Sequence, residues 1–283
     1  MKYLKIASAC VCCLSKSVEK APAVLMPFIA ERIFGWKPVK IDEGWGLKDI
    51  KKGNAYSLCN TLSCKRCGHL FLDLRFSDSD MAKLYENYRG PSYVAQREKY
   101  EKGYARKNLD LLHPIDYLKD IEAFINKYVK NKKFLLDWGG GDGANTPFKN
   151  KVKKLHIFDI SRSNFDSTYV SFKELSENKY DLILCRNVLE HIPWPIPFLK
   201  KISSIMNDKN FLYLDLPLED LMVKSRMDKS FFKKKRHWHE HINFFSKESL
   251  EQTIKRSGLK IIAYQEYEYS PSKYIYQVIC KKR

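Results

Sequence analysis

Cysteines and histidines stand at spacings that suit metal binding or proton transfer at two places in the chain. Two Cys-x-x-Cys pairs, Cys10/Cys13 and Cys64/Cys67, have the spacing of a tetrahedral zinc site. Four thiolates leave no open coordination position, so we expect this zinc to be structural. Cys12 adjoins Cys13, which leaves the register of the first pair open. Thiolates of this kind belong in a reducing compartment, and we therefore expect a cytoplasmic protein.

The second place is the run His237-Trp-His239-Glu240-His241, which holds three histidines and a glutamate in five residues. A metal site is one interpretation of this run. Proton transfer is the other, and we favour it because histidine titrates near neutral pH. Adjacent side chains on an extended loop diverge, so Glu240 either orients His241 or contacts substrate hydroxyls instead.

A glycine-rich turn follows a short apolar run. Phe134–Leu136 leads into Asp137 and then into four glycines between positions 139 and 143. Glycine adopts φ angles closed to other residues, so this pattern indicates a buried strand that opens into a ligand-binding turn. The spacing also fits a dinucleotide fingerprint, and a glycine-rich hairpin is a further alternative. Asp142 disfavours a pyrophosphate here, and we favour a ligand that carries positive charge near the turn.

Tyrosines alternate with arginines and lysines between residues 76 and 105. Such side chains stack on rings and bind anions, whereas an amphipathic packing face is the alternative for the tyrosines. We interpret this stretch as a lid over the substrate. The residues expected to contact the substrate are Tyr93, Arg97 and His239.

Composition bounds the class of protein. The chain has 283 residues, of which 44% are hydrophobic and 13% aromatic, and this is typical of a globular protein with one or two domains. Its 51 basic and 33 acidic residues give a net charge of +18. That charge suits a nucleic acid, an anionic sugar nucleotide, a peripheral membrane surface, or merely a lysine-rich proteome. The basic residues form no long stripe with interleaved aromatics, which disfavours nucleic acid, and no stretch is long and apolar enough to span a membrane.

The stretch from Leu135 to Gly143 resembles the first motif of the class I S-adenosylmethionine-dependent methyltransferases. In that family the glycine turn packs on the methionine part of the cofactor, and an acid that ends the second strand binds the ribose hydroxyls. The resemblance assigns that acid to Asp159. It implies the following cofactor-binding residues: Asp137, Gly139, Gly141, Gly143, Asp159, Arg186 and Asn187.

The stretch from Trp238 to Ser246 is similar to one in the C-methyltransferases of nucleotide-linked deoxysugars, which also carry an N-terminal cysteine-rich zinc module. The resemblance implies that Glu240 and His241 form an acid/base pair at the substrate. His191, in the motif Glu-His after the strand 180–185, either touches the substrate or caps a turn. The sequence departs from those enzymes because it ends just after its sheet, so their substrate is not carried over.

The elements that must position these residues alternate between strand and helix after residue 132, and this alternation predicts a parallel sheet. We expect an α/β, Rossmann-like sheet of seven mostly parallel strands with an antiparallel last strand, including a weak third strand at 169–172. A helix is expected from about 106 to 130, interrupted at Pro114. The expected domains are a zinc module over 1–75, a helical lid and linker over 76–131, and a cofactor domain over 132–283.

Together these features predict a cytoplasmic methyltransferase that uses S-adenosylmethionine and a structural zinc ion. Its predicted substrate is a sugar, a sugar nucleotide or another small phosphate-bearing intermediate of surface glycan biosynthesis. The rivals are an RNA methyltransferase and a non-catalytic zinc-dependent binding module. The intact glycine turn and Asp159 argue against the binding module. The acceptor atom (oxygen, nitrogen or carbon) and the oligomeric state stay open.

Overall fold

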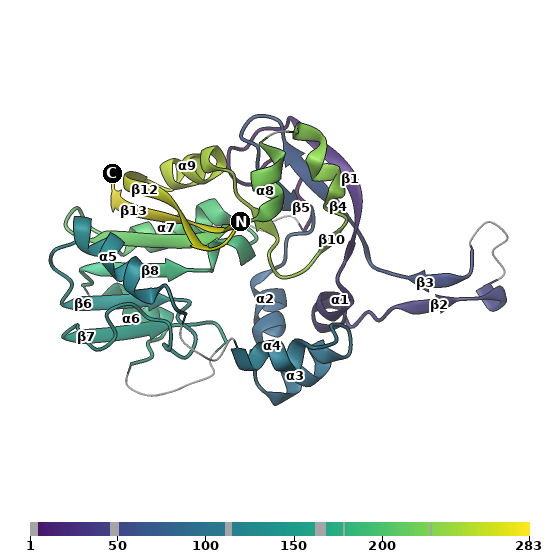
Figure 1. Cartoon of the computed structure of the whole chain (residues 1–283), viewed down its shortest axis with the longest axis horizontal. Helices are drawn as coiled ribbons and strands as arrows, with labels where there is room; N and C mark the ends of the chain where they lie inside the picture. The colour runs from purple at the N-terminus through teal and green to yellow at the C-terminus, as the bar shows by residue number, and fades with distance from the viewer. Residues whose placement is uncertain (1–4, 46–50, 111–114, 162–167, 178, 227) are drawn as a thin grey trace.

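The computed structural model describes residues 5–45, 51–110, 115–161, 168–177, 179–226 and 228–283. Two larger β-sheets share one hydrophobic core, and a group of short helices lies beside them (Figure 1). A two-stranded hairpin projects away from this body (Figure 1).

The larger sheet has six strands in the order β12-β13-β9-β8-β6-β7. The four strands β7, β6, β8 and β9 run parallel to one another, and helices cover the apolar runs among them, as is usual for parallel strands. The last strand, β13, lies antiparallel to both β9 and β12, as expected from the sequence. The strands are β6 (Phe134–Trp138), β7 (Lys154–Phe158), β8 (Leu182–Arg186), β9 (Phe211–Leu218), β12 (Leu259–Ser270) and β13 (Lys273–Lys282).

The expected seventh strand at 169–172 is reduced to a single parallel bridge between Ile157 and Tyr169. The chain turns directly into helix α6 (Phe172–Glu177) at this point. The Glu174 carboxylate accepts hydrogen bonds from both the backbone N–H and the hydroxyl of Ser171, which fixes the first turn of the helix. Among the described residues, this sheet therefore has six strands rather than seven.

Helices cover both faces of the six-stranded sheet. On one face, α5 (Leu118–Tyr128) packs its apolar side against β6, β8 and β9. On the other, α7 (Pro195–Ser204) and α9 (Lys247–Arg256) bury their apolar stripes in the main core. Ser246 begins α9 with a capping box, and Gly258 follows it at φ 76°. This three-layer arrangement leaves the carboxyl ends of the parallel strands open to build a site.

The second sheet has five strands in the order β10-β1-β4-β5-β11. Three come from the N-terminal region: β1 (Val18–Leu25), β4 (Leu58–Cys64) and β5 (Leu70–Leu72). The two edge strands come from far along the chain: β10 (His237–Trp238) and β11 (Asn243–Phe244). The histidine-rich run thus lies between two strands that complete the cysteine-bearing sheet.

The helical group contains α1 (Pro27–Phe34), α2 (Asp78–Tyr85), α3 (Pro91–Glu98) and α4 (Tyr104–Asp110). The helix expected over 106–130 with an interruption at Pro114 is two helices, α4 and α5; Pro114 itself lies outside the described residues. The projecting hairpin consists of β2 (Val39–Ile41) and β3 (Gly53–Ala55), with the 3-10 turn η1 (Glu43–Trp45) after β2.

Candidate active site

The glycine turn follows β6 and is held from both sides. Gly139, Gly141 and Gly143 have φ angles of 84°, 56° and 70°, in the region that favours glycine. A Cβ atom on Gly139 would lie 2.4 Å from Val188 Cγ2, so the backbone approaches its neighbour too closely for a side chain. The Asp159 carboxylate accepts hydrogen bonds of 2.8 Å from the Gly141 N–H and the Ser161 N–H. The turn and Asp159 therefore form one unit at the ends of β6 and β7.

Asp137 and Arg186 are buried and bind residues that follow the glycine turn. Asp137 is 3% exposed, and its carboxylate accepts a 2.5 Å hydrogen bond from the Thr146 hydroxyl. Burial raises the pKa of Asp137 to about 6. The buried Arg186 forms a 2.7 Å ion pair with Asp215 and donates a hydrogen bond to the Asn145 carbonyl. Both side chains thus brace the residues after the glycines.

Asn187 is the exposed residue of the same strand end. It has a φ angle of 49°, in the left-handed region, and its N–H donates to the Asp215 carbonyl at 2.9 Å. Its side chain is exposed, and the next residue, Val188, lies against Gly139 of the glycine turn. Of the predicted cofactor-binding side chains, Asp159 and Asn187 are therefore the accessible ones.

A second group of polar residues gathers near the end of β8. We call Glu190, His191, Glu219, Glu240 and His241 the histidine–glutamate cluster. His191 ends the 3-10 turn η2 (Leu189–His191), and Glu219 stands between β9 and α8 (Asp220–Ser225). The rings of His191 and His241 lie 4.6 Å apart, and the ring of His239 lies 5.3 Å from that of His241. The structure thus brings the three predicted histidines together.

Glu240 and His241 do not contact each other through their side chains. His241 Nδ1 lies 2.8 Å from Glu219 Oε1, and this contact raises the pKa of His241 above its usual value despite burial. The Glu240 carboxylate instead pairs with Arg97 at 2.6 Å. Burial opposes ionisation, yet Arg97 lowers the pKa of Glu240 to about 2. Glu219, which the sequence analysis missed, is therefore the carboxylate that holds His241.

The two predicted lid residues are packed inside the molecule. Tyr93 is fully buried against Phe28, as an amphipathic packing face requires. Arg97 donates to the Tyr93 hydroxyl at 3.2 Å and pairs with Glu101 at 2.7 Å. Arg97 thus connects the helical group to Glu240.

Glu190 was also missed by the sequence analysis. Its side chain is 2% exposed, and neither carboxylate oxygen has a hydrogen-bond partner among the described residues. Burial raises the pKa of this carboxyl to about 8. The signal for both missed residues is an acid just after a strand of a parallel sheet, where ligand sites form.

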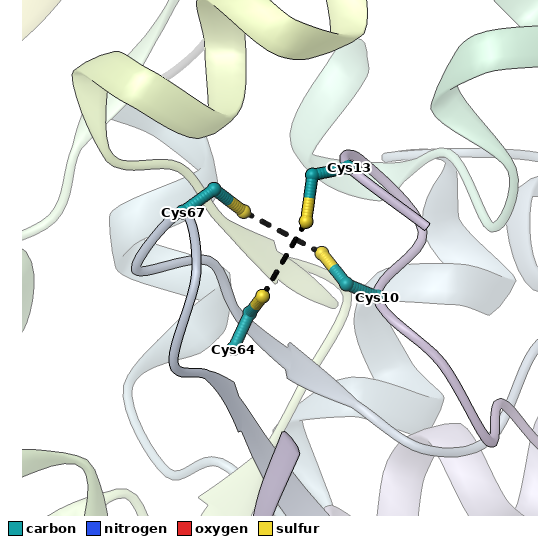
Figure 2. Close-up of side chains that lie close together, drawn as sticks. All are labelled: Cys10, Cys13, Cys64 and Cys67. Atoms are coloured by element: carbon teal, nitrogen blue, oxygen red, sulfur yellow. Dashed lines mark hydrogen bonds between the residues drawn. The ribbon is translucent and has the colours of Figure 1, made fainter. Parts of the chain in front are cut away.

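The four cysteines of the two Cys-x-x-Cys pairs converge, as Figure 2 shows. Cys10 Sγ lies 3.6 Å from Cys67 Sγ, and Cys13 Sγ lies 3.5 Å from Cys64 Sγ. Four thiolates around one zinc ion with bonds of about 2.3 Å stand about 3.8 Å apart, so this cluster could hold a metal ion. Cys12 is buried outside the group.

The cysteine cluster is joined to the rest of the fold. The Ser246 hydroxyl, which caps α9, donates a hydrogen bond to the Cys67 carbonyl. Gly68, at φ 67°, closes the turn of the second pair by donating to the Cys64 carbonyl at 2.9 Å. Within the described ranges, every helix is too short or too polar to cross a membrane.

Comparison with known proteins identifies the family to which most of the six-stranded sheet belongs. A family model described as a methyltransferase domain matches residues 111–264, more than half of the chain. The chain is 28% identical over 125 residues to an uncharacterized protein of Methanocaldococcus jannaschii, a match that covers 40% of this chain. It spans about half (54%) of the length of that curated relative.

Two solved structures illustrate the likeness in fold. One is the 1,6-didemethyltoxoflavin-N1-methyltransferase of Burkholderia thailandensis with bound S-adenosylhomocysteine (TM-score 0.48, 11% identity, 77% of this chain and 96% of that one). The other is an S-adenosylmethionine-dependent methyltransferase of Clostridium acetobutylicum (TM-score 0.43, 16% identity, 59% and 92%).

Proposed function

Because the chain belongs to the methyltransferase domain family, we propose that it transfers a methyl group from S-adenosylmethionine to a small acceptor. The observation that carries this proposal is the glycine turn fixed to Asp159 at the open ends of β6 and β7. Gly139, Gly141 and Gly143 let the cofactor approach the backbone. The carboxylate of Asp159 has lone pairs left to accept from the ribose hydroxyls, and Asn187 lies toward the methionine end.

The acceptor in this proposal is a sugar, a sugar nucleotide or another small phosphate-bearing intermediate of surface glycan biosynthesis. Support comes from the likeness of the loop 238–246 to that of the deoxysugar C-methyltransferases. In this structure the stretch includes β11, and its residues 239–242 connect β10 to β11, so the cysteine-bearing sheet and the histidine–glutamate cluster share this segment. The net charge of +18 suits an anionic acceptor. We place the protein in the cytoplasm, where both the cofactor and reduced thiols are available.

The chemistry of transfer requires positioning and, for a hydroxyl or carbon acid, removal of a proton. In the cluster without a bound ion, Nε2 of His241 takes that proton, while Glu219 stabilises the imidazolium through Nδ1. Glu240 and His191 stand next to this position. Glu240, held by Arg97, accepts from acceptor hydroxyls, and His239 borders the acceptor. Tyr93 and Arg97 act by holding Glu240 rather than by touching the acceptor.

We propose zinc for the cysteine cluster, with Cys10, Cys13, Cys64 and Cys67 as ligands. The donor set is four buried thiols, which suit zinc and leave no position for a substrate. The ion would therefore stabilise the five-stranded sheet and, through β10 and β11, the loop that carries His241.

A methyl-transfer screen tests the proposal. The purified protein is incubated with S-adenosylmethionine labelled on the methyl group and, separately, with nucleotide sugars, capsule or lipopolysaccharide precursors, and total RNA. We expect label in a sugar-bearing acceptor. Asp159→Ala should lose most of it because ribose hydrogen bonds of about 1.5–3 kcal/mol each are removed, whereas Asp208→Asn, at an exposed acid, should match the wild type. Label only in RNA would assign the enzyme to RNA, and no label in any acceptor would contradict the proposal.

A further inference from the structure

Three metal-ligating side chains converge in the histidine–glutamate cluster, apart from the cysteines. One ligand atom each from Glu190, His191 and His241 lie within 4.8 Å of one another. They come from η2 and from the loop between β10 and β11, which meet through the backbone bond from Ile242 N–H to the Glu190 carbonyl. What occupies the space between them depends on which of these atoms carry hydrogen.

In its neutral form, His241 keeps one ring nitrogen free to bind a ligand. Its Nδ1 lies 2.8 Å from Glu219 Oε1. A carboxylate at this distance accepts a hydrogen bond from the ring nitrogen. The hydrogen of the neutral ring is therefore on Nδ1, and Nε2 carries a lone pair.

His191 presents a bare nitrogen for a similar reason. Its Nδ1 lies 3.0 Å from the backbone carbonyl of Glu240 and 2.8 Å from the Tyr85 hydroxyl. A carbonyl oxygen only accepts, so Nδ1 carries the hydrogen. Nε2 then has a lone pair, and it lies 3.7 Å from Glu190 Oε1.

Glu190 completes the set with two unpartnered oxygens. Its side chain is 2% exposed, and neither oxygen finds a donor among the described residues. A buried acceptor left without a partner costs about 1–3 kcal/mol, and more when it is charged. Two imidazole nitrogens and a carboxylate that lie this close together form a set of ligands for an ion that supplies positive charge.

We propose that Glu190, His191 and His241 bind a divalent transition-metal ion. Two histidines and one carboxylate form a ligand set that holds such ions and leaves coordination positions open. The Nδ1 atoms of both histidines are already held, one by a carboxylate and one by a backbone carbonyl, as is usual for metal-bound imidazoles. The site differs from the cysteine cluster in its nitrogen and oxygen ligands, so it accepts Mn²⁺ as well as Zn²⁺, whereas the thiolates favour Zn²⁺.

The role of this ion rests on the proposed methyl transfer. An acceptor hydroxyl bound at an open position loses its proton to water more readily, because the ion stabilises the oxyanion. The oxygen electron pair then forms the bond to the methyl carbon, while the carbon–sulfur bond breaks and its electron pair returns to sulfur. His241 holds the ion in this form of the reaction and does not itself take the proton.

The test measures binding of Mn²⁺ alone, without cofactor or acceptor. Protein holding a single zinc ion per chain, after a chelator has removed any weakly bound metal, is titrated with Mn²⁺, and the free ion is counted by electron paramagnetic resonance; the thiolates retain zinc, whereas the imidazole and carboxylate ligands accept Mn²⁺. We expect one Mn²⁺ per chain and an affinity lowered at least tenfold in Glu190→Gln. The control Glu248→Gln changes an exposed glutamate of α9 and should bind as the wild type does.

Absence of Mn²⁺ binding in the wild type, or unchanged affinity in Glu190→Gln, overturns the inference. His191→Gln serves as a second variant. Thermal melts show which of Glu190→Gln and His191→Gln is folded, and the affinity of that variant is the one compared. Methyl transfer by a protein that binds no Mn²⁺ would contradict the metal site and leave the proposed function unaffected. Mn²⁺ binding without methyl transfer to any acceptor would support the metal site and contradict the proposed function.

Discussion

The cysteine cluster is fully buried and the histidine–glutamate cluster only partly so; both are rich in metal-ligating groups, yet they are built in different ways. The cysteine cluster takes four identical ligands from two tight turns, each readable as a Cys-x-x-Cys pair. The histidine–glutamate cluster takes mixed groups from η2, from the end of β9 and from the loop between β10 and β11. The first arrangement suits stability, since nothing is left open. The second leaves the oxygens of Glu190 unpartnered, which suits chemistry.

The largest effect is expected at the cysteine cluster. Cys64→Ser combined with Cys67→Ser should lose the zinc and unfold the five-stranded sheet, because structural zinc contributes about 10–16 kcal/mol of apparent binding energy. Elemental analysis and a circular-dichroism melt measure both outcomes. Cys59→Ser is the control, since Cys59 is buried in β4 outside the group of four. Full metal content in the double variant would show that this cluster is not the zinc site.

The next effect is expected at His241 and concerns rate rather than folding. His241→Gln should keep the affinity for S-adenosylmethionine, measured by calorimetry, and lower turnover by roughly 10²–10⁴-fold, the span for loss of a group that handles the acceptor's proton. His237→Gln, at the exposed end of β10, is the matched control and should turn over normally. Turnover near the wild-type rate in His241→Gln would favour nitrogen methylation driven by positioning alone.

The sequence could predict the features whose residues lie close together along the chain. The glycine turn, Asp159 and the four cysteines belong to short patterns whose spacing reflects backbone geometry, and the structure brings each of these groups together. The partner of His241 is not local. Glu219 lies 22 positions away, and the neighbour Glu240 turns toward Arg97, from 143 positions away. Which carboxylate meets which cation depends on the packing of α3 and the end of β9, which no sequence spacing records.

Asp137 should make the free energy of unfolding depend on pH, whereas the cysteine cluster should make it depend on zinc. Burial raises its pKa to about 6, from 3.8 when unfolded. The folded protein therefore holds the proton longer, and the free energy of unfolding should fall by about 3 kcal/mol as pH rises from about 4 to above 6. Asp137→Asn keeps an acceptor for the Thr146 hydroxyl and should remove this contribution, so it is the more stable form at pH 7.

Urea unfolding of Asp137→Asn and the wild type at pH 4 and pH 7 measures this difference. Asp208→Asn, at an exposed acid, should follow the wild type at both pH values. A difference between Asp137→Asn and the wild type that is equal at the two pH values would mean that ionisation of Asp137 is not its source.

The smallest effect is expected from changes at Glu219 and Glu240, the two carboxylates that are candidates for the partner of His241 in catalysis. Glu219 Oε1 lies 2.8 Å from His241 Nδ1, whereas Glu240 is engaged by Arg97 at 2.6 Å. Glu219→Gln keeps the shape but replaces the charged acceptor, and it should lower turnover about 10–100-fold, as loss of a partner behind a working histidine does. Glu240→Gln should cost less than that, because Arg97 retains Glu101 and the amide oxygen still accepts from Arg97. Turnover of both variants on the true acceptor, with cofactor affinity measured in parallel, gives the comparison.

Glu240→Gln could instead be the more damaging change while its melting temperature stays that of the wild type. Glu240 rather than Glu219 would then be the carboxylate that acts with His241, and the ion pair with Arg97 would have to open during turnover.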